Sequence, residues 1–359
     1  MPAEWSQAMS KICVVAALSV SGFLLAGCAT GVSPTTQPPP SQPTVTGGTP
    51  AAPTRVPGST PLPWLGGVVP LQFPQQELAG KPADIAVAAD GTLFLADTKN
   101  HAIVHIDPAG TLLYRWGSFS GSEQTPSAPT GTFNEPWGIG LAPDGTIYVA
   151  DTWNHRIQVF TAAGEYLRSW GQFGQGVEPS GLFGPRDVAV GHDGLIYVSD
   201  TGNKRIVVYT SEGEYVTQIG GEGDQLGKFV EPVGIAFSEA GDLYVADEGN
   251  RRVQVLAVGE AGEMNPKAAW SVDAWPHNDM LYKPYLCVLG ERVFLTDTES
   301  GSVIEYTTSG ELRARYDLNS TGVLNYGLVY GIAPQADGAL WVSDIAGGAP
   351  VLVKIVPLP

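Results

Sequence analysis

Six residues that recur at one position of the sequence could form a binding site. Each enters a short apolar run, and the first five follow a proline: Ala83, Trp137, Arg186, Val233, Tyr285 and Tyr330. Aromatic rings with one guanidinium among them could stack on a planar or sugar-like ligand, or hold an anion. The same side chains could instead fill an interior space and bind nothing. Both interpretations require the six positions to converge, and that depends on the surrounding elements.

A second recurring residue is an aspartate that ends an apolar run. The six runs are LFLAD, IYVAD, IYVSD, LYVAD, VFLTD and LWVSD, which end at Asp97, Asp151, Asp200, Asp247, Asp297 and Asp344. One carboxylate per run, spread along the chain, is a poor catalytic constellation. We predict that each accepts hydrogen bonds from turn amides or pairs with a basic residue a few positions on, such as Arg156, Arg205 or Arg252.

These aspartates mark an internal repeat of about 50 residues. The second repeat contains four apolar runs separated by turn residues: Gly138–Leu141, Ile147–Ala150, Ile157–Phe160 and Tyr166–Trp170. Such a pattern is typical of four short antiparallel strands joined by tight turns. A lone four-stranded sheet cannot shield both of its faces, so the copies must pack side by side. The six copies predict an all-β fold, a six-bladed β-propeller of four-stranded antiparallel blades.

From about Gly66 to Leu358 the chain resembles the NHL-repeat β-propellers. The string DTWNHRIQVF at 151–160 is nearly the ideal form of that motif. The motif is strong in the first four repeats and weaker in the last two, which lack its asparagine and its basic residue. In such a propeller the six positions converge at one mouth of the central channel, where proteins of this shape bind ligands.

The two ends of the predicted propeller should meet in one sheet. The sixth repeat supplies only three apolar runs, Gly331–Pro334, Ala339–Ser343 and Val351–Val356. The apolar segment Gly67–Phe73, ahead of the first repeat, can fill the missing outer strand. We therefore predict that an N-terminal strand closes the last blade, and that the propeller domain spans residues 64–359.

Residues 1–27 predict a signal peptide. Lys11 precedes the apolar run Ile12–Leu25, and Leu25-Ala26-Gly27-Cys28 resembles the lipobox of bacterial lipoproteins. That resemblance implies cleavage before Cys28, lipidation of its sulfur, and an extracytoplasmic protein anchored to a bacterial membrane. An ordinary signal peptide or a signal anchor is the alternative, and translation could begin at Met1 or Met9. Residues 28–63, which are rich in Pro, Thr and Ser, predict a disordered tether.

Comparison with known propeller enzymes bears on the alternative that the chain is an enzyme. The chain resembles the peptidyl-hydroxyglycine amidating lyase, in which histidines that follow the proline bind zinc, but none of the six positions here is histidine. One fragment of that pattern remains. Asp84 and Asp187, which follow Ala83 and Arg186, match an aspartate that helps to hold a structural calcium in the channel. Capping of strand-end amides is the alternative role for both. The Glu, Asn and Asp set that six-bladed lactonases place around calcium is not found.

The connections between repeats are rich in glycine and should lie on the face of the mouth, where loops on a rigid scaffold hold specificity. The connection Ser271–Leu281 has the densest group of reactive side chains, and from it Trp275 and His277 join the candidate binding residues. A histidine beside a tryptophan could also be merely packed.

Charge and cysteine content narrow the function. The chain has 36 acidic and 19 basic residues, a net charge of −17, which argues against the RNA binding known among NHL propellers with basic faces. Once Cys13 is removed and Cys28 lipidated, Cys287 alone remains, so no disulfide is expected. We predict a monomeric binding or scaffolding propeller that recognises a protein, peptide or glycan ligand at the channel mouth. The alternative is a lyase or lactonase that depends on a divalent cation.

Overall fold

The computed structural model describes residues 69–71, 80–121, 128–176, 178–275, 283–319, 328–346 and 349–357. All of them lie in the larger of two compact units, residues 58–359. The predicted signal peptide, the lipidated Cys28 and the tether lie outside the described residues. Within the described part of the chain, no helix is both long enough and apolar enough to cross a membrane.

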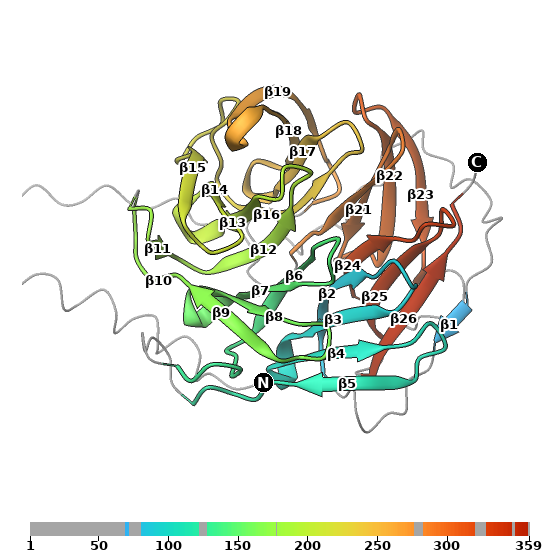
Figure 1. The fold of residues 1–359 in the computed structure, drawn as a ribbon. Coiled ribbons are helices and arrows are strands. Elements are labelled where there is room, and N and C mark those ends of the chain that lie inside the picture. The colour runs from blue at the N-terminus through green and yellow to red at the C-terminus, as the bar shows by residue number, and fades with distance from the viewer. Residues whose placement is uncertain are drawn as a thin grey trace, which may run out of the picture. The chain divides into compact units, whose positions relative to one another are not determined.

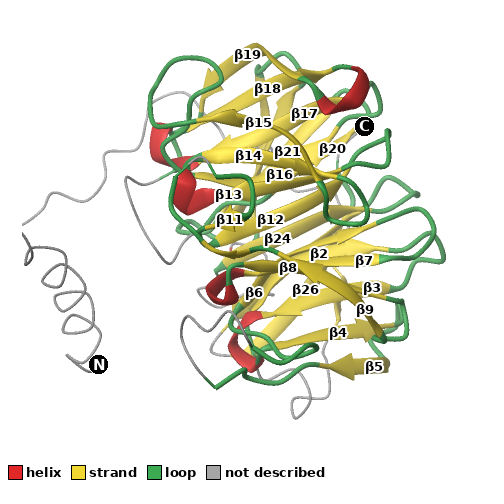
Figure 2. Ribbon diagram, turned by 60° about the vertical axis from the view of Figure 1, so that its left-hand side comes forward, coloured by secondary structure: helices red, strands yellow, loops and turns green. Residues whose placement is uncertain are grey.

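The fold is all-β, and six four-stranded antiparallel sheets follow one another around a central axis (Figure 1). The inner strand of each sheet contacts the inner strands of the sheets before and after it, and the last contacts the first. The connecting loops gather at the two ends of the strands and form the two faces of the ring (Figure 2). The predicted six-bladed β-propeller is therefore confirmed.

The blades follow the chain in order. From the inner strand outward, blade one is β2 (Pro82–Val87), β3 (Leu93–Asp97), β4 (Ala102–Ile106) and β5 (Leu112–Trp116), and blade two is β6 (Pro136–Leu141), β7 (Ile147–Asp151), β8 (Arg156–Phe160) and β9 (Tyr166–Trp170). Blade three is β12 (Pro185–Val190), β13 (Ile196–Asp200), β14 (Arg205–Tyr209) and β15 (Tyr215–Gly220), and blade four is β16 (Pro232–Phe237), β17 (Asp242–Asp247), β18 (Arg252–Val258) and β19 (Met264–Ser271). Blade five is β20 (Leu286–Leu289), β21 (Arg292–Asp297), β22 (Ser302–Thr307) and β23 (Leu312–Asp317), and blade six is β24 (Val329–Pro334), β25 (Leu340–Ala346), β26 (Ala349–Ile355) and β1 (Val69–Leu71). Strands β10 (Gln172–Phe173) and β11 (Gly181–Leu182) form a short parallel pair between the second and third blades.

Burial explains why the apolar runs are continuous. All residues of the second strands β3, β7 and β13 are buried, because each blade packs a neighbour on both faces. The outer strands β5 and β9 are partly or fully exposed along their whole length. The hydrophobic core is therefore divided into clusters that lie between successive blades.

The N-terminal strand closes the sixth blade, as predicted. Strand β1 pairs antiparallel with β26, with Val69, Pro70 and Leu71 opposite Lys354, Val353 and Leu352. It thereby covers the outer edge of a blade that has only three strands from its own repeat.

Deletion of residues 64–73 should destabilise the ring, because the edge of β26 would lose its only partner on that side in the described sheet. We expect the melting temperature to fall by roughly 5 °C or more. A thermal melt followed by circular dichroism measures this, and an unchanged melting curve would show that the ring is closed in another way.

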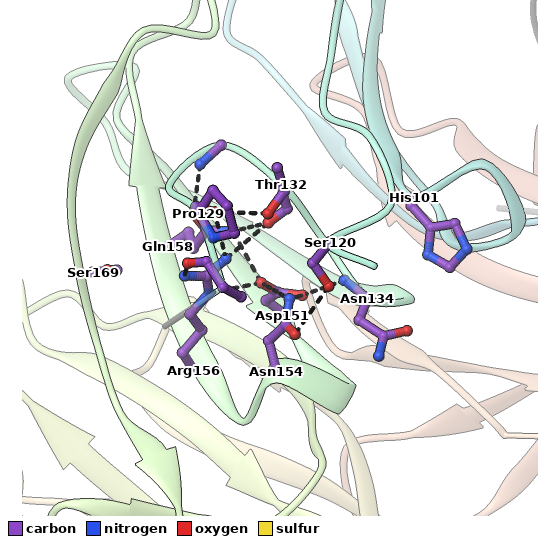
Figure 3. A network of polar contacts seen from close by, with 12 residues as sticks. His101, Ser120, Pro129, Thr132, Asn134, Asp151, Asn154, Arg156, Gln158 and Ser169 are labelled. Carbon is purple, nitrogen blue, oxygen red and sulfur yellow. Dashed lines mark hydrogen bonds and ion pairs between the residues drawn. The ribbon is translucent and has the colours of Figure 1, made fainter. Parts of the chain in front are cut away.

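Each of the first four blades has a 3-10 turn after its second strand, and the repeated aspartate accepts a hydrogen bond from the asparagine side chain of that turn. In blade two the Asp151 carboxylate is fully buried. It accepts hydrogen bonds from the backbone amide of Asn134, the Asn154 side chain, Arg156 Nε and Gln158 Nε2, at 2.8–3.1 Å (Figure 3). All of this network lies within one blade and the loop that leads into it.

Arg156 extends the network to the incoming loop. Its guanidinium donates to three backbone carbonyls of residues 128–132 at 2.8–3.1 Å. The same type of ion pair recurs in the next two blades: Arg205 Nε to Asp200 Oδ2 at 2.7 Å and Arg252 Nε to Asp247 Oδ2 at 2.9 Å. The predicted structural role of these aspartates is therefore confirmed.

Candidate binding site at the channel mouth

A β-bulge turns the candidate residues out of the strand ladder. In the first three blades the pairing of the inner with the second strand skips Ala83, Trp137 and Arg186. A bulge of this kind re-aims the side chain of the skipped residue. Ala83, Trp137 and Tyr285 come from blades one, two and five yet belong to one buried cluster. Residues at three of the six candidate positions therefore lie together although they come from separate blades.

Tyr285 fills the channel instead of lining an open mouth. It is 1% exposed. Its hydroxyl lies 3.1 Å from the backbone carbonyl oxygens of both Trp137 and Arg186, so a side chain of blade five reaches across the axis to blades two and three. Ala83 and Val233 are fully buried. These three positions behave as interior filling.

The other three candidate residues, Trp137, Arg186 and Tyr330, are nearly as buried, at 4%, 6% and 3% exposed, and they form a set of cation–π contacts with Lys81. The Arg186 guanidinium carbon lies 4.1 Å from the centre of the Trp137 ring, and Lys81 Nζ lies 4.2 Å from the same ring. Lys81 Nζ is also 4.0 Å from the centre of the Tyr330 ring, so the ammonium sits between rings of blades two and six. These are cation–π contacts. Trp137, Arg186 and Tyr330 thus meet around a lysine that comes from blade one.

Glu135 completes this group in a strained backbone conformation. Its φ is 52°, a value that costs energy for any residue with a side chain, and blade three has Gly184 at the same position with a φ of 61°. His101 Nδ1 accepts the Glu135 N–H at 3.0 Å. The Glu135 carboxylate accepts the indole N–H of Trp153 at 2.9 Å and that of Trp137 at 3.4 Å. A glutamate kept where glycine would be relaxed indicates that its side chain is needed.

We call Lys81, Glu135, Trp137, Arg186 and Tyr330 the mouth cluster. Two of its members, Lys81 and Glu135, are not among the residues predicted from the sequence. Both stand immediately before a proline at the start of an inner strand, as does Glu231 in blade four, and Lys283 precedes the corresponding proline just ahead of β20 in blade five. The recurring Lys-Pro and Glu-Pro pairs were the signal that could have identified them.

Lys283, which precedes the corresponding proline of blade five, is a cation that acidic side chains neutralise. Its Nζ lies 2.6 Å from Glu231 Oε1 and 3.3 Å from Glu248 Oε2. Glu248 is fully buried in the slot that threonine occupies in the first three blades. Burial, and then the hydrogen bond with Glu231, raise the pKa of Glu248 to about 8. Two carboxyl groups therefore surround the Lys283 ammonium.

Asp84 and Asp187 meet in the buried interior. Each carboxylate accepts the amide of the next residue and one amide from the inner strand of the following blade, at 2.7–2.9 Å. Capping of strand amides, the alternative role considered for them, is therefore confirmed. Glycine allows the inner strands to approach so closely, since a Cβ at Gly138 would lie 2.5 Å from the Asp187 Cα.

Without a bound cation, the aspartate pair is expected to share a proton. Burial, and then the charge of Asp187, raise the pKa of Asp84 well above its ordinary value, and burial raises the pKa of Asp187 to about 7. Calcium takes about six to eight oxygen ligands. The neighbouring carbonyls of Trp137 and Arg186, which could supply two of them, accept the Tyr285 hydroxyl. The structural calcium remains a prediction.

Trp275 lies apart from the mouth cluster. Trp275 is 2% exposed and packs in the core between blades four and five, where its indole N–H donates to the Thr296 carbonyl at 3.1 Å. His277 lies outside the described residues. Cys287 is a free, buried thiol whose pKa is raised by burial.

Comparison with known proteins agrees with the repeat and the fold. The NHL repeat model matches residues 133–160, 184–209 and 229–256, which lie in blades two, three and four. The chain is thus a six-bladed β-propeller that contains NHL repeats.

Solved structures with a similar fold belong to proteins whose names indicate different functions. They include virginiamycin B lyase from Staphylococcus aureus (16% identity, 82% of this chain and 100% of that chain, TM-score 0.55), a candidate gluconolactonase (15%, 82% and 93%, 0.56) and a chain of the nidogen–laminin complex (19%, 69% and 82%, 0.51). Likeness at such identities shows the fold alone, because one propeller fold carries many functions.

Proposed function

We propose that this protein is an extracytoplasmic, membrane-tethered binding propeller that recognises a protein, peptide or glycan ligand at the channel mouth. The observation that carries the proposal is the mouth cluster. Side chains of four blades converge there, with a strained glutamate orienting two tryptophans. Aromatic and arginine side chains dominate binding energy at protein interfaces. The protein acts as a monomer in this proposal.

A thermal-shift screen of peptides, glycans and small acids tests the proposal, each variant being compared with its own ligand-free melting temperature. We expect Trp137→Phe and Arg186→Ala to weaken a genuine ligand by about tenfold or more. Trp341→Phe is the matched control, because Trp341 is also buried and has a lysine, Lys354, 5.8 Å from its ring. Ligands that respond equally to all three substitutions would place binding elsewhere.

The location of the protein is part of the same proposal and is supported by the lipobox around Cys28. We expect wild-type protein to incorporate labelled palmitate in bacteria, since lipid chains hold such proteins at a membrane. Cys28→Ala should abolish the label and leave a precursor that retains residues 1–27. A variant that is still labelled, or still cleaved after residue 27, would contradict the lipoprotein assignment.

An enzymatic role is the second candidate, namely a lyase or lactonase that uses a divalent cation. It is favoured by the names of two proteins that share the fold. Metal analysis of the purified protein separates the two functions. Stoichiometric zinc, or calcium that is needed for turnover, would support the enzyme over the binding propeller.

A further inference from the structure

We infer that the mouth cluster binds ligands through a carboxylate group, which Arg186 and Lys81 hold. The inference rests on the proposed binding function and specifies the chemistry of the ligand at that site.

The first support is that the positive charge of the cluster lacks a carboxylate partner. In the described part of the chain, no carboxylate lies within 4 Å of Lys81 or Arg186, whereas Lys283 at the same face has two. Arg186 is 6% exposed, and its Nη1 has no hydrogen-bond partner among the described residues. An unpartnered buried guanidinium nitrogen is costly, and a ligand oxygen would satisfy it.

The second support is the positive electrostatic potential at Lys81. Burial, and then the charge of Arg186, lower the pKa of Lys81 to about 7, while Glu135 acts in the opposite direction without cancelling them. An anion placed beside both cations would relieve this repulsion.

The aromatic rings argue against a cationic ligand. Tryptophan and tyrosine faces can hold an ammonium ligand, but here Lys81 and Arg186 already occupy the faces of Trp137 and Tyr330. An added cation would meet like charges in a partly desolvated site. The net charge of −17 attracts cations to the protein as a whole, but fields are screened beyond about 8 Å and do not decide contact chemistry.

The charge balance favours a carboxylate over a phosphate. With Lys81 protonated, the cluster has two cations and one carboxylate, that of Glu135, which is hydrogen-bonded to two indoles. A bound monoanion would leave this set neutral and would raise the pKa of Lys81, which is about 7 without it. A guanidinium fork also binds a carboxylate in a bidentate way, which gives it orientation as well as charge.

Three probes of the same shape test the charge requirement on full-length protein: benzoate, benzamide and benzylammonium, with inorganic phosphate as a fourth. We expect benzoate to bind at least about tenfold more tightly than benzamide, and benzylammonium and phosphate to bind more weakly still. Isothermal titration calorimetry measures all four affinities. Because wild-type protein is used, the result does not depend on the folding of any variant.

Variants then locate the effect. Glu135→Gln keeps an acceptor for the indoles but removes the negative charge, so benzoate should bind about threefold more tightly. Arg186→Ala should weaken benzoate about tenfold, and Arg186→Lys should restore part of the loss. Lys267→Gln is the control, since Lys267 is an exposed lysine paired with Asp242 on the blade-four sheet. It should leave benzoate affinity unchanged.

The outcomes separate this inference from the function on which it rests. If benzamide binds as tightly as benzoate and both are weakened by Trp137→Phe, the binding site stands and the carboxylate requirement is wrong. The carboxylate requirement would also be wrong if benzylammonium or phosphate bound more tightly than benzoate, or if Glu135→Gln bound benzoate more weakly than the wild type. It would be wrong as well if benzoate did not bind at millimolar concentration. If ligands of every charge are insensitive to Trp137→Phe, the proposed function itself fails.

Discussion

Replacement of Asp151 by alanine is expected to lower the free energy of unfolding by about 3–5 kcal/mol, the typical loss when one partner of a buried ion pair is removed. The reason is what the substitution leaves behind. Arg156 and Gln158 would remain buried without the carboxylate that they share. The loop at 128–134 would also lose the anchor of the Asn134 amide. Urea denaturation of the purified protein measures the change.

Blade five offers a matched control for this substitution. Asp297 ends the equivalent strand, but its basic partner, Arg315, has a side chain that is 43% exposed and can return to water. Asp297→Ala should therefore cost clearly less than Asp151→Ala. Equal costs for the two variants would show that the arginine-linked network adds nothing beyond capping of the turn.

Asp84→Asn is expected to make the protein more stable at pH 7.5, by on the order of 2 kcal/mol, and to flatten the dependence of its stability on pH. The folded-state pKa values of Asp84 and Asp187 are raised. Between about pH 4 and 7 the folded protein therefore binds more protons than the unfolded chain, and wild-type stability falls as pH rises. Asparagine never ionises, and its side-chain amide can donate to Asp187, although it gives up one of the two backbone amides that the Asp84 oxygens accept.

Denaturation curves between pH 4 and 8, each with and without calcium, measure this. A protein whose pair holds a proton should show the gain at pH 7.5 and little response to calcium. The opposite pattern, with Asp84→Asn less stable than wild type and calcium stabilising the wild type alone, would show that a cation occupies the pair. Asp187→Asn should behave in the same way as Asp84→Asn.

The fold could be predicted because its determinants are local and repeated. The string DTWNHRIQVF contains the aspartate, asparagine, arginine and glutamine that anchor one turn, so a single stretch specifies its own network. The closing strand could be predicted because the last repeat lacks one apolar run. Blade five departs from the string and still forms four strands, since burial between neighbours determines them.

The site could be predicted only in part, because it depends on distances across the ring. Tyr285 and Tyr330 occupy equivalent positions in the repeat, yet the Tyr285 hydroxyl reaches carbonyls of blades two and three, whereas the Tyr330 ring packs on Lys81. The indole N–H of Trp275 donates to a buried carbonyl of the next blade, a contact that the spacing of residues in the sequence does not indicate. Glu135 was missed because its role follows from a backbone angle and from two indoles that converge on it.

The most direct test of the account is to locate where a ligand contacts the ring. Hydrogen–deuterium exchange with and without the strongest ligand from the screen should show protection in residues 80–87, 135–141 and 184–190, where the mouth cluster joins the inner strands. Protection confined to the outer strands β5, β9 and β15, with no change at those inner segments, would contradict a binding site at the channel mouth.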